Sequence, residues 1–247
     1  MYTFIGCSGF HYDGWKGIFY PEELPKEQWL SFYAEHFKSV EINNSFYRLP
    51  QADTLKKWYE QTPGHFRFSM KGSRYVTHMK KLVDDEDLHE GIKKFYEVVE
   101  TLRGKLGCVL WQLPGNLHRH DEKLKNFCSL LSSDVKNVIE FRHESWFVDP
   151  VFEILEAHNV SYCIISAPEA LPDIVRSTND TAYVRFHGTS EMYDYAYSDD
   201  EIKDWSCKLQ ALSVRRIYVY FNNDYEASAV KNAKSMNREF EVMKEKR

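Results

Sequence analysis

Five apolar runs of this 247-residue sequence each end in a pair of polar residues that lie two positions apart. A β-strand sends alternate side chains to opposite faces, so both members of a pair lie on one side of their strand. Their apolar neighbours then face the other side. Polar side chains of one parity at several strand ends predict a single convergent site. The pairs are Glu41 and Asn43, Ser69 and Lys71, Glu140 and Arg142, Arg185 and His187, and Tyr220 and Asn222.

The charged members of these pairs favour a site for a small anion. Two glutamates stand against one lysine and two arginines, which leaves an excess of positive charge. Arg142 and Arg185 carry planar guanidinium groups that match carboxylates and phosphates. We therefore expect a phosphorylated or carboxylated, sugar-like molecule to bind there. The alternative is a self-neutralising salt-bridge network that only fills the interior.

Four residues are candidates for catalysis. Glu41 or Glu140, held among cations or partly desolvated, can transfer protons together with His187. Lys71 can in principle form a Schiff base with a carbonyl group. A lysine close to two carboxylates keeps its proton, so we favour a clamp for the anion at Lys71. The reaction class stays open among hydrolase, isomerase and lyase types.

The remaining candidates would bind the substrate. Arginines hold the anion, amide groups exchange hydrogen bonds with hydroxyls, and aromatic rings line a cleft. We expect these contacts from Arg142, Arg185, Asn43, Gln112, Asn222, Asn223, Tyr47, His143 and Trp146.

A divalent metal ion is a weaker alternative at the same place. Glu41, Glu140 and His187 are residue types that bind such ions. The cations expected at the same mouth repel a metal, so the sequence implies no cofactor.

Strand-like and helical patterns alternate along the whole chain. Eight strands over about 250 residues match one (β/α)8 TIM-like barrel that spans residues 1–247 as a single domain. A doubly wound open sheet is the alternative, but polar pairs on many strands converge only in a closed ring. The segment 166–180 contains Pro168 and Pro172, and there we expect a loop or one helical turn instead of a helix.

The boundaries follow from the same patterns. The predicted strands are Thr3–Cys7, Ser39–Ile42, Phe66–Met70, Gly107–Trp111, Asn137–Phe141, Ser161–Ile165, Ala182–Phe186 and Ile217–Phe221. The predicted helices are Pro25–Phe37, Asp53–Tyr59, Asp87–Leu102, Asp121–Leu131, Pro150–His158, Ser198–Leu212 and Tyr225–Met243.

Composition restricts the class of protein. A chain with 43% hydrophobic and 28% charged residues is typical of a soluble globular protein. Its net charge of −5 provides no global field for nucleic acid or an anionic membrane. The five scattered cysteines include no C-x-x-C pair, and no apolar stretch reaches the ~20 residues that span a bilayer. We expect a reduced, cytoplasmic protein that does not contact a membrane.

Several segments together resemble the family called domain of unknown function 72, also known as YecE-like. The E-x-R-H-x-S-W and F-N-N combinations are specific, and the resemblance covers nearly the whole chain. The matching segments are Ile5–Phe10, Glu41–Tyr47, Phe66–Lys71, Leu110–Pro114, Glu140–Trp146, Val184–Gly188 and Tyr220–Asn223.

The resemblance implies a TIM-like barrel, and it supplies no substrate or reaction. Barrels of this group have been likened to the endonuclease IV and xylose isomerase type, which implies nucleic acid or sugar chemistry with divalent metals. This chain lacks the metal-binding residues of those enzymes. An enzyme for a small anion is therefore our first hypothesis. The second is a nucleic-acid binding or repair module in which Trp15, Tyr47, Trp146 and Tyr195 stack on bases.

Overall fold

Eight parallel strands form the centre of the protein, whose structure is a computed structural model that describes residues 1–168, 171–190 and 193–245. Each strand lies within two residues of its predicted position. The strands are β1 (Tyr2–Cys7), β2 (Ser39–Ile42), β3 (Arg67–Lys71), β4 (Leu106–Gln112), β5 (Asn137–Glu140), β6 (Ser161–Ser166), β7 (Thr181–Phe186) and β8 (Arg216–Phe221).

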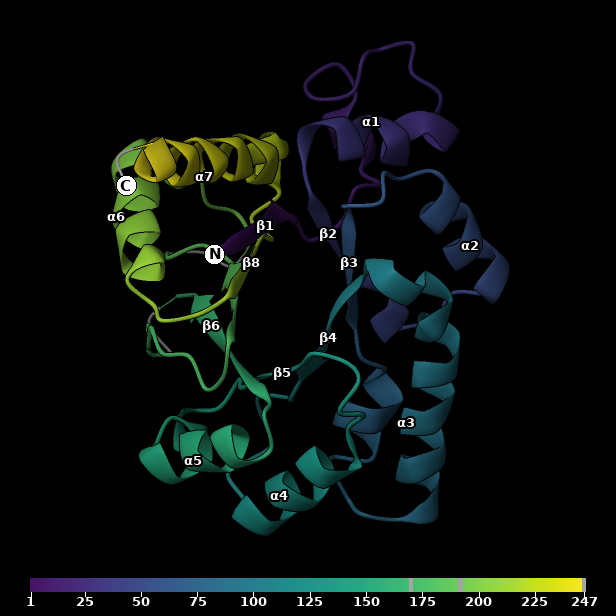
Figure 1. Cartoon of the computed structure of the whole chain (residues 1–247), viewed down its shortest axis with the longest axis vertical. Coiled ribbons are helices and arrows are strands. Elements are labelled where there is room, and N and C mark those ends of the chain that lie inside the picture. Colours follow the sequence, from purple (N-terminus) through teal and green to yellow (C-terminus); the bar gives the residue numbers. More distant parts are fainter. Residues whose placement is uncertain (169–170, 191–192, 246–247) are drawn as a thin grey trace.

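The strands follow one another in the order β1-β8-β7-β6-β5-β4-β3-β2, so the sheet curls into a nearly closed barrel. Figure 1 shows the helices around this barrel in chain order. The predicted (β/α)8 TIM-like barrel is confirmed. The helices are α1 (Trp29–His36), α2 (Ala52–Glu60), α3 (Glu86–Val99), α4 (Asp121–Leu130), α5 (Asp149–Ala157), α6 (Asp199–Gln210) and α7 (Ser228–Glu245).

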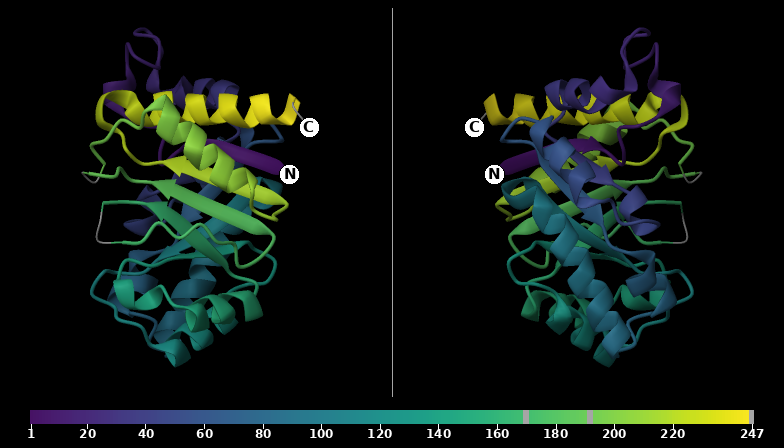
Figure 2. Two further views of the ribbon diagram at one scale, coloured as in Figure 1. Left: turned by 90° about the vertical axis from the view of Figure 1, so that its left-hand side faces the viewer. Right: turned by 90° about the vertical axis from the view of Figure 1, so that its right-hand side faces the viewer.

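Alternation along the strands separates two apolar layers. Residues of one parity, such as Val40, Phe68 and Val184, belong to the large core between strands and helices. Residues of the other parity, such as Leu110 and Tyr183, fill the barrel itself. The strands that enclose this interior are tilted, as the side views show (Figure 2). The chain therefore positions its polar strand ends on the inner face, as the spacing predicts.

Local signals also set the ends of helices. α6 begins after Ser198, whose hydroxyl accepts a hydrogen bond from the amide of Glu201, while the Glu201 carboxylate accepts one from the amide of Ser198. This reciprocal cap satisfies two amides that the helix leaves free. Between β6 and β7, residues 167–168 and 171–180 contain no helix, as the two prolines predict. None of the helices in the described ranges is long and apolar enough to cross a membrane.

The barrel has one seam, between β1 and β2. No backbone ladder joins these two strands, both of which are fully described. The hydroxyl of Tyr33 lies between them instead: it accepts a hydrogen bond from the amide of Cys7 at 2.7 Å and donates one to the carbonyl of Ser39 at 3.0 Å. A side chain on Gly6 would place its Cβ 1.9 Å from the Ser39 carbonyl oxygen, so the approach requires glycine.

Candidate functional site

Arg185 lies at the centre of a buried cluster of charges inside the barrel. Its guanidinium nitrogens donate to Glu41 at 2.9 Å and to Glu140 at 2.6 Å. β7 supplies the arginine, and β2 and β5 supply the glutamates, so three separated strands meet at one point. Arg185 is 1% exposed and both glutamates are 0% exposed. Charges taken out of water at this depth require the close partners that they have here.

Every oxygen of the two carboxylates accepts at least one hydrogen bond. Tyr183 donates to Glu41 at 2.7 Å, and Gln112 donates to Glu140 at 2.8 Å, where Arg142 also donates. Burial alone would raise the pKa of each carboxyl, but nearby arginine charge and hydrogen bonds together outweigh burial and lower the pKa of both below its ordinary value. Both glutamates therefore stay ionised.

His187 is a neutral, fully buried imidazole beside this cluster. Burial, together with the charge of Arg185, lowers the pKa of His187 to about 4. Its Nε2 lies 2.9 Å from a guanidinium nitrogen of Arg142, and the amide of Asn222 lies 3.2 Å from Nδ1. Arginine can only donate, so Nε2 accepts the hydrogen bond from Arg142. The imidazole thus fixes the position of Arg142.

Lys71 occupies the mouth at the end of β3 in a different way. Its ammonium group lies 4.4 Å from the centre of the Phe46 ring, and no carboxylate of the described residues lies within 4.0 Å of it. Burial, with a contribution from Arg185, lowers the pKa of Lys71 to about 8. The sequence predicts two neighbouring carboxylates that keep this lysine protonated, but both carboxylates bind Arg185 instead.

Comparison with other proteins places the chain in a family. Residues 4–247 match the family described as "Protein of unknown function DUF72". The chain belongs to this family.

Relatives in the DUF72 family share sequence and fold. The UPF0759 protein YunF of Bacillus subtilis is 26% identical in an alignment of 264 residues that covers 94% of this chain and 93% of YunF. The UPF0759 protein YecE of Escherichia coli K12 is 31% identical over 119 residues, 48% of this chain and 43% of YecE. The crystal structure of a DUF72 family protein from Thermotoga maritima is 30% identical, with a TM-score of 0.89 over 98% of this chain and 100% of that chain.

Two predicted site residues of this DUF72 chain lie in other networks. Asn223 is 0% exposed, and its amide donates to the side chain of Asn232 on α7 at 2.8 Å. Trp146 is 1% exposed, and its indole donates to the carbonyl of Leu117 at 2.7 Å. Both side chains are therefore covered by the protein itself. Parity does not apply to them because they lie beyond the strands, Trp146 in a short 3-10 helix (Glu144–Trp146) and Asn223 after β8.

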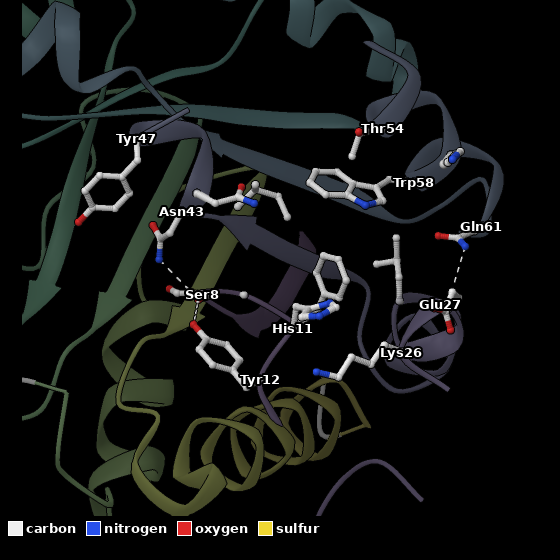
Figure 3. Close-up of a pocket in the computed structure, with 16 residues that line it drawn as sticks. Ser8, His11, Tyr12, Lys26, Glu27, Asn43, Tyr47, Thr54, Trp58 and Gln61 are labelled. Atoms are coloured by element: carbon white, nitrogen blue, oxygen red, sulfur yellow. Dashed lines mark hydrogen bonds between the residues drawn. The ribbon is translucent and has the colours of Figure 1, made fainter. Parts of the chain in front are cut away.

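Two further candidates lie outside the charged cluster. The centroid of the His143 ring lies 3.9 Å from that of His118, with the two rings tilted by 39°, and His143 hydrogen-bonds Ser145 at 2.9 Å. Tyr47 is 79% exposed and lines a cleft beside the mouth (Figure 3). Asn43 connects this cleft with the cluster, because its Oδ1 accepts from Arg185 at 3.4 Å.

The sequence reasoning missed two residues. Tyr183 shares its parity with Arg185 on β7, so the alternation rule already pointed to its contact with Glu41. Asp224 follows β8 and accepts a hydrogen bond from the indole of Trp15 at 2.6 Å, while burial raises the pKa of Asp224 to about 6. No spacing rule could find Asp224, since it lies beyond the regular strand.

The described residues contain no group of three or more His, Cys, Asp and Glu side chains placed to hold a metal ion. Of the possible metal ligands, Glu41 and Glu140 both face the guanidinium of Arg185.

Proposed function

We propose that the protein is an enzyme that binds a small anionic substrate, phosphorylated or carboxylated, at the C-terminal mouth of the barrel. The observation that carries the proposal is the pair of cations above the buried cluster. Lys71 has no carboxylate partner among the described residues, and Arg142 is held by Glu140 and His187 with its side chain 12% exposed. Two glutamates balance only part of the charge of these two residues and Arg185.

Lys71 is the group that this geometry supports for proton transfer. An amine with a pKa of about 8 is partly neutral near neutral pH, so it can accept and return a proton. The sequence suggested Glu41 or Glu140 together with His187 for this task. Their hydrogen bonds favour another role, in which the glutamates fix Arg185 and Arg142 and the imidazole positions Arg142.

The amides of the predicted site surround the same mouth. Asn43 contacts Arg185, Asn222 contacts His187, and Gln112 contacts Glu140, each through only part of its hydrogen-bonding capacity. Their remaining donors and acceptors suit the hydroxyl groups of a sugar-like molecule.

Thermal unfolding with a panel of phosphosugars and organic acids tests the proposal. A ligand present at about 100 times its Kd should raise Tm by about 5–10 °C, because binding to the folded state alone adds to stability. Lys71→Met should lose most of this shift. The control Lys93→Met removes a lysine on α3 that is 68% exposed and should keep the shift. The proposal fails if no anion raises Tm, or if Lys71→Met responds as the control does.

The nucleic-acid alternative is not favoured. Two of its four stacking candidates, Trp15 and Trp146, are each 1% exposed, so no base can reach their rings.

A further inference from the structure

A cleft of about 610 Å³ opens beside the mouth, between the loop after β1 and helix α2. Figure 3 shows Trp58 on one side of this cleft and His11 on the other, with Ser8 and Asn43 at its inner end. The volume lies in the range of small-molecule sites, roughly 300–1,000 Å³. None of these residues except Asn43 and Tyr47 belongs to the site predicted from sequence.

The walls of the cleft are aromatic and firmly supported. The Trp58 ring meets Phe10 edge to face, with centroids 5.8 Å apart, and stacks on Phe68 at 6.1 Å. Leu30 and Ile42, which also line the cleft, are 2% and 3% exposed. Rigid aromatic and aliphatic faces of this kind fit a planar ring.

The inner end of the cleft is polar and adjoins the charged cluster. The Ser8 carbonyl accepts hydrogen bonds from Tyr12 at 2.7 Å and from Asn43 at 3.5 Å, and Asn43 in turn contacts Arg185. The Ser8 hydroxyl is buried and has no hydrogen-bond partner of good geometry in the described part of the chain, although it lies close enough to Glu41 to help lower its pKa.

We propose that this cleft binds a planar aromatic ring of the substrate whose anionic group binds at the mouth. The inference rests on the proposed function and specifies its substrate class as ring-bearing anions. Asn43 and Ser8 separate the two parts of the site, so the linker between ring and anion passes over these two residues.

Tryptophan fluorescence can report on the cleft directly. Five of the six tryptophans are 0–5% exposed, and Trp58 is the one with intermediate exposure. Acrylamide, a collisional quencher, therefore reaches mainly Trp58. Phenyl phosphate should protect the fluorescence from acrylamide, whereas methyl phosphate at the same saturation should not. Phenyl phosphate should also bind about tenfold more tightly than methyl phosphate.

Two variants complete the test. Trp58→Ala should reduce the ratio of the two affinities towards one, and Trp205→Phe, which changes a tryptophan that is 5% exposed on α6, should preserve the ratio. The quenching result in the unchanged protein holds even if Trp58→Ala does not fold.

The outcomes separate the two proposals. If both phosphates bind equally and leave Trp58 open to acrylamide, the cleft inference is overturned and the anion site stands. If the two phosphates and benzoate do not bind while a phosphosugar or another organic acid raises Tm, the cleft inference is overturned and the anion site stands. If no anion of any kind binds, the proposed function itself fails. If neutral phenol protects Trp58 while no anion binds, the ring site is not coupled to the mouth, and the inference is overturned as well.

Discussion

Lys71 is the mouth cation with the least compensation. Its amine is mostly buried against Phe46, and burial lowers its pKa from 10.5 to about 8. A protonated amine in such a place reduces the stability of the folded state. A lysine that is kept at this cost is a candidate for function, because functional groups often hold perturbed pKa values.

Lys71→Met should therefore raise the free energy of unfolding at pH 7, by about 1–3 kcal/mol. The pKa of Lys71 is lower in the folded than in the unfolded chain, so protonation favours unfolding. The wild type regains this stability as the pH rises from about 8 to 10.5, and the difference between the two proteins should shrink over that range. Urea unfolding at pH 7 and pH 10.5 measures the free energy of unfolding of both proteins. An equal difference between wild type and Lys71→Met at the two pH values would contradict the argument. Lys93→Met should be as stable as the wild type at either pH.

Arg185→Met should have the opposite effect at neutral pH. It would leave Glu41 without its ion-pair partner and Glu140 with only Arg142, and uncompensated buried charges cost about 3–5 kcal/mol. In the wild type the lowered pKa of Glu41 supplies stability above its unfolded value of 4.5. In the variant the pKa of the buried Glu41 carboxyl should rise. Acidification from pH 8 to 5 should therefore reduce the difference in the free energy of unfolding between wild type and variant.

Arg176→Met is the matched control for this prediction. Arg176 also contacts two carboxylates, Asp149 and Glu156, but its side chain is 35% exposed. Surface ion pairs contribute about 0–1 kcal/mol, so its removal should change stability little at either pH. A comparable loss in the two variants would show that the buried cluster is not special.

At the scale of single residues, alternation predicted which strand side chains meet but not what they do to each other. Glu41, Glu140 and Arg185 share the expected face. That Arg185 would bind both carboxylates, and leave Lys71 without either, depends on distances that spacing does not encode. Trp146 and Asn223 lie after strand ends, where the two-residue period no longer fixes direction.

At the scale of elements, the pattern predicted the strands, the helices and the barrel, but not the seam between β1 and β2. Hydrophobic periodicity and caps are local signals, so the strands and helices could be read directly. The seam between β1 and β2 could not, since it arises where Tyr33, from α1, meets two strands. Gly6 signals a close approach only after its neighbour Ser39 is known.

Tyr33→Phe should lower the free energy of unfolding by about 1–3 kcal/mol. It would leave the buried amide of Cys7 and the carbonyl of Ser39 without the hydroxyl that now joins them. Tyr2→Phe, at a ring that is 67% exposed on β1, should be neutral. Denaturant unfolding measures both variants. The role of the seam would be refuted if Tyr33→Phe were as stable as Tyr2→Phe.

A pair of glycine variants tests how closely the two strands approach each other at the same seam. Gly6→Ala forces its Cβ against the Ser39 carbonyl and should destabilise the protein strongly. Gly64→Ala places its Cβ where no atom lies within 4 Å and should change stability little.

At the scale of the whole molecule, global and local charge have opposite signs. The chain carries a net charge of −5, yet the mouth keeps an excess of cations over the cluster. A negative protein with a local positive site suits small anions, which enter the mouth, better than long polyanions, which also meet the surrounding surface. The net charge follows from composition, whereas the separation of the two signs follows from the barrel, which gathers the cations on its inner face.

Labelled single-stranded oligonucleotides should therefore bind no more tightly than a Kd of about 10⁻⁴ M, even at 50 mM salt, the weak limit of non-specific binding. Fluorescence anisotropy at 50 and 200 mM salt measures this. The small anion that raises Tm, titrated under the same conditions, should bind at both salt concentrations, because most of its contacts lie in the mouth and are weakly screened. Tight oligonucleotide binding that falls steeply between 50 and 200 mM salt would reverse the order of the two hypotheses, since such a slope measures phosphates neutralised along an extended surface.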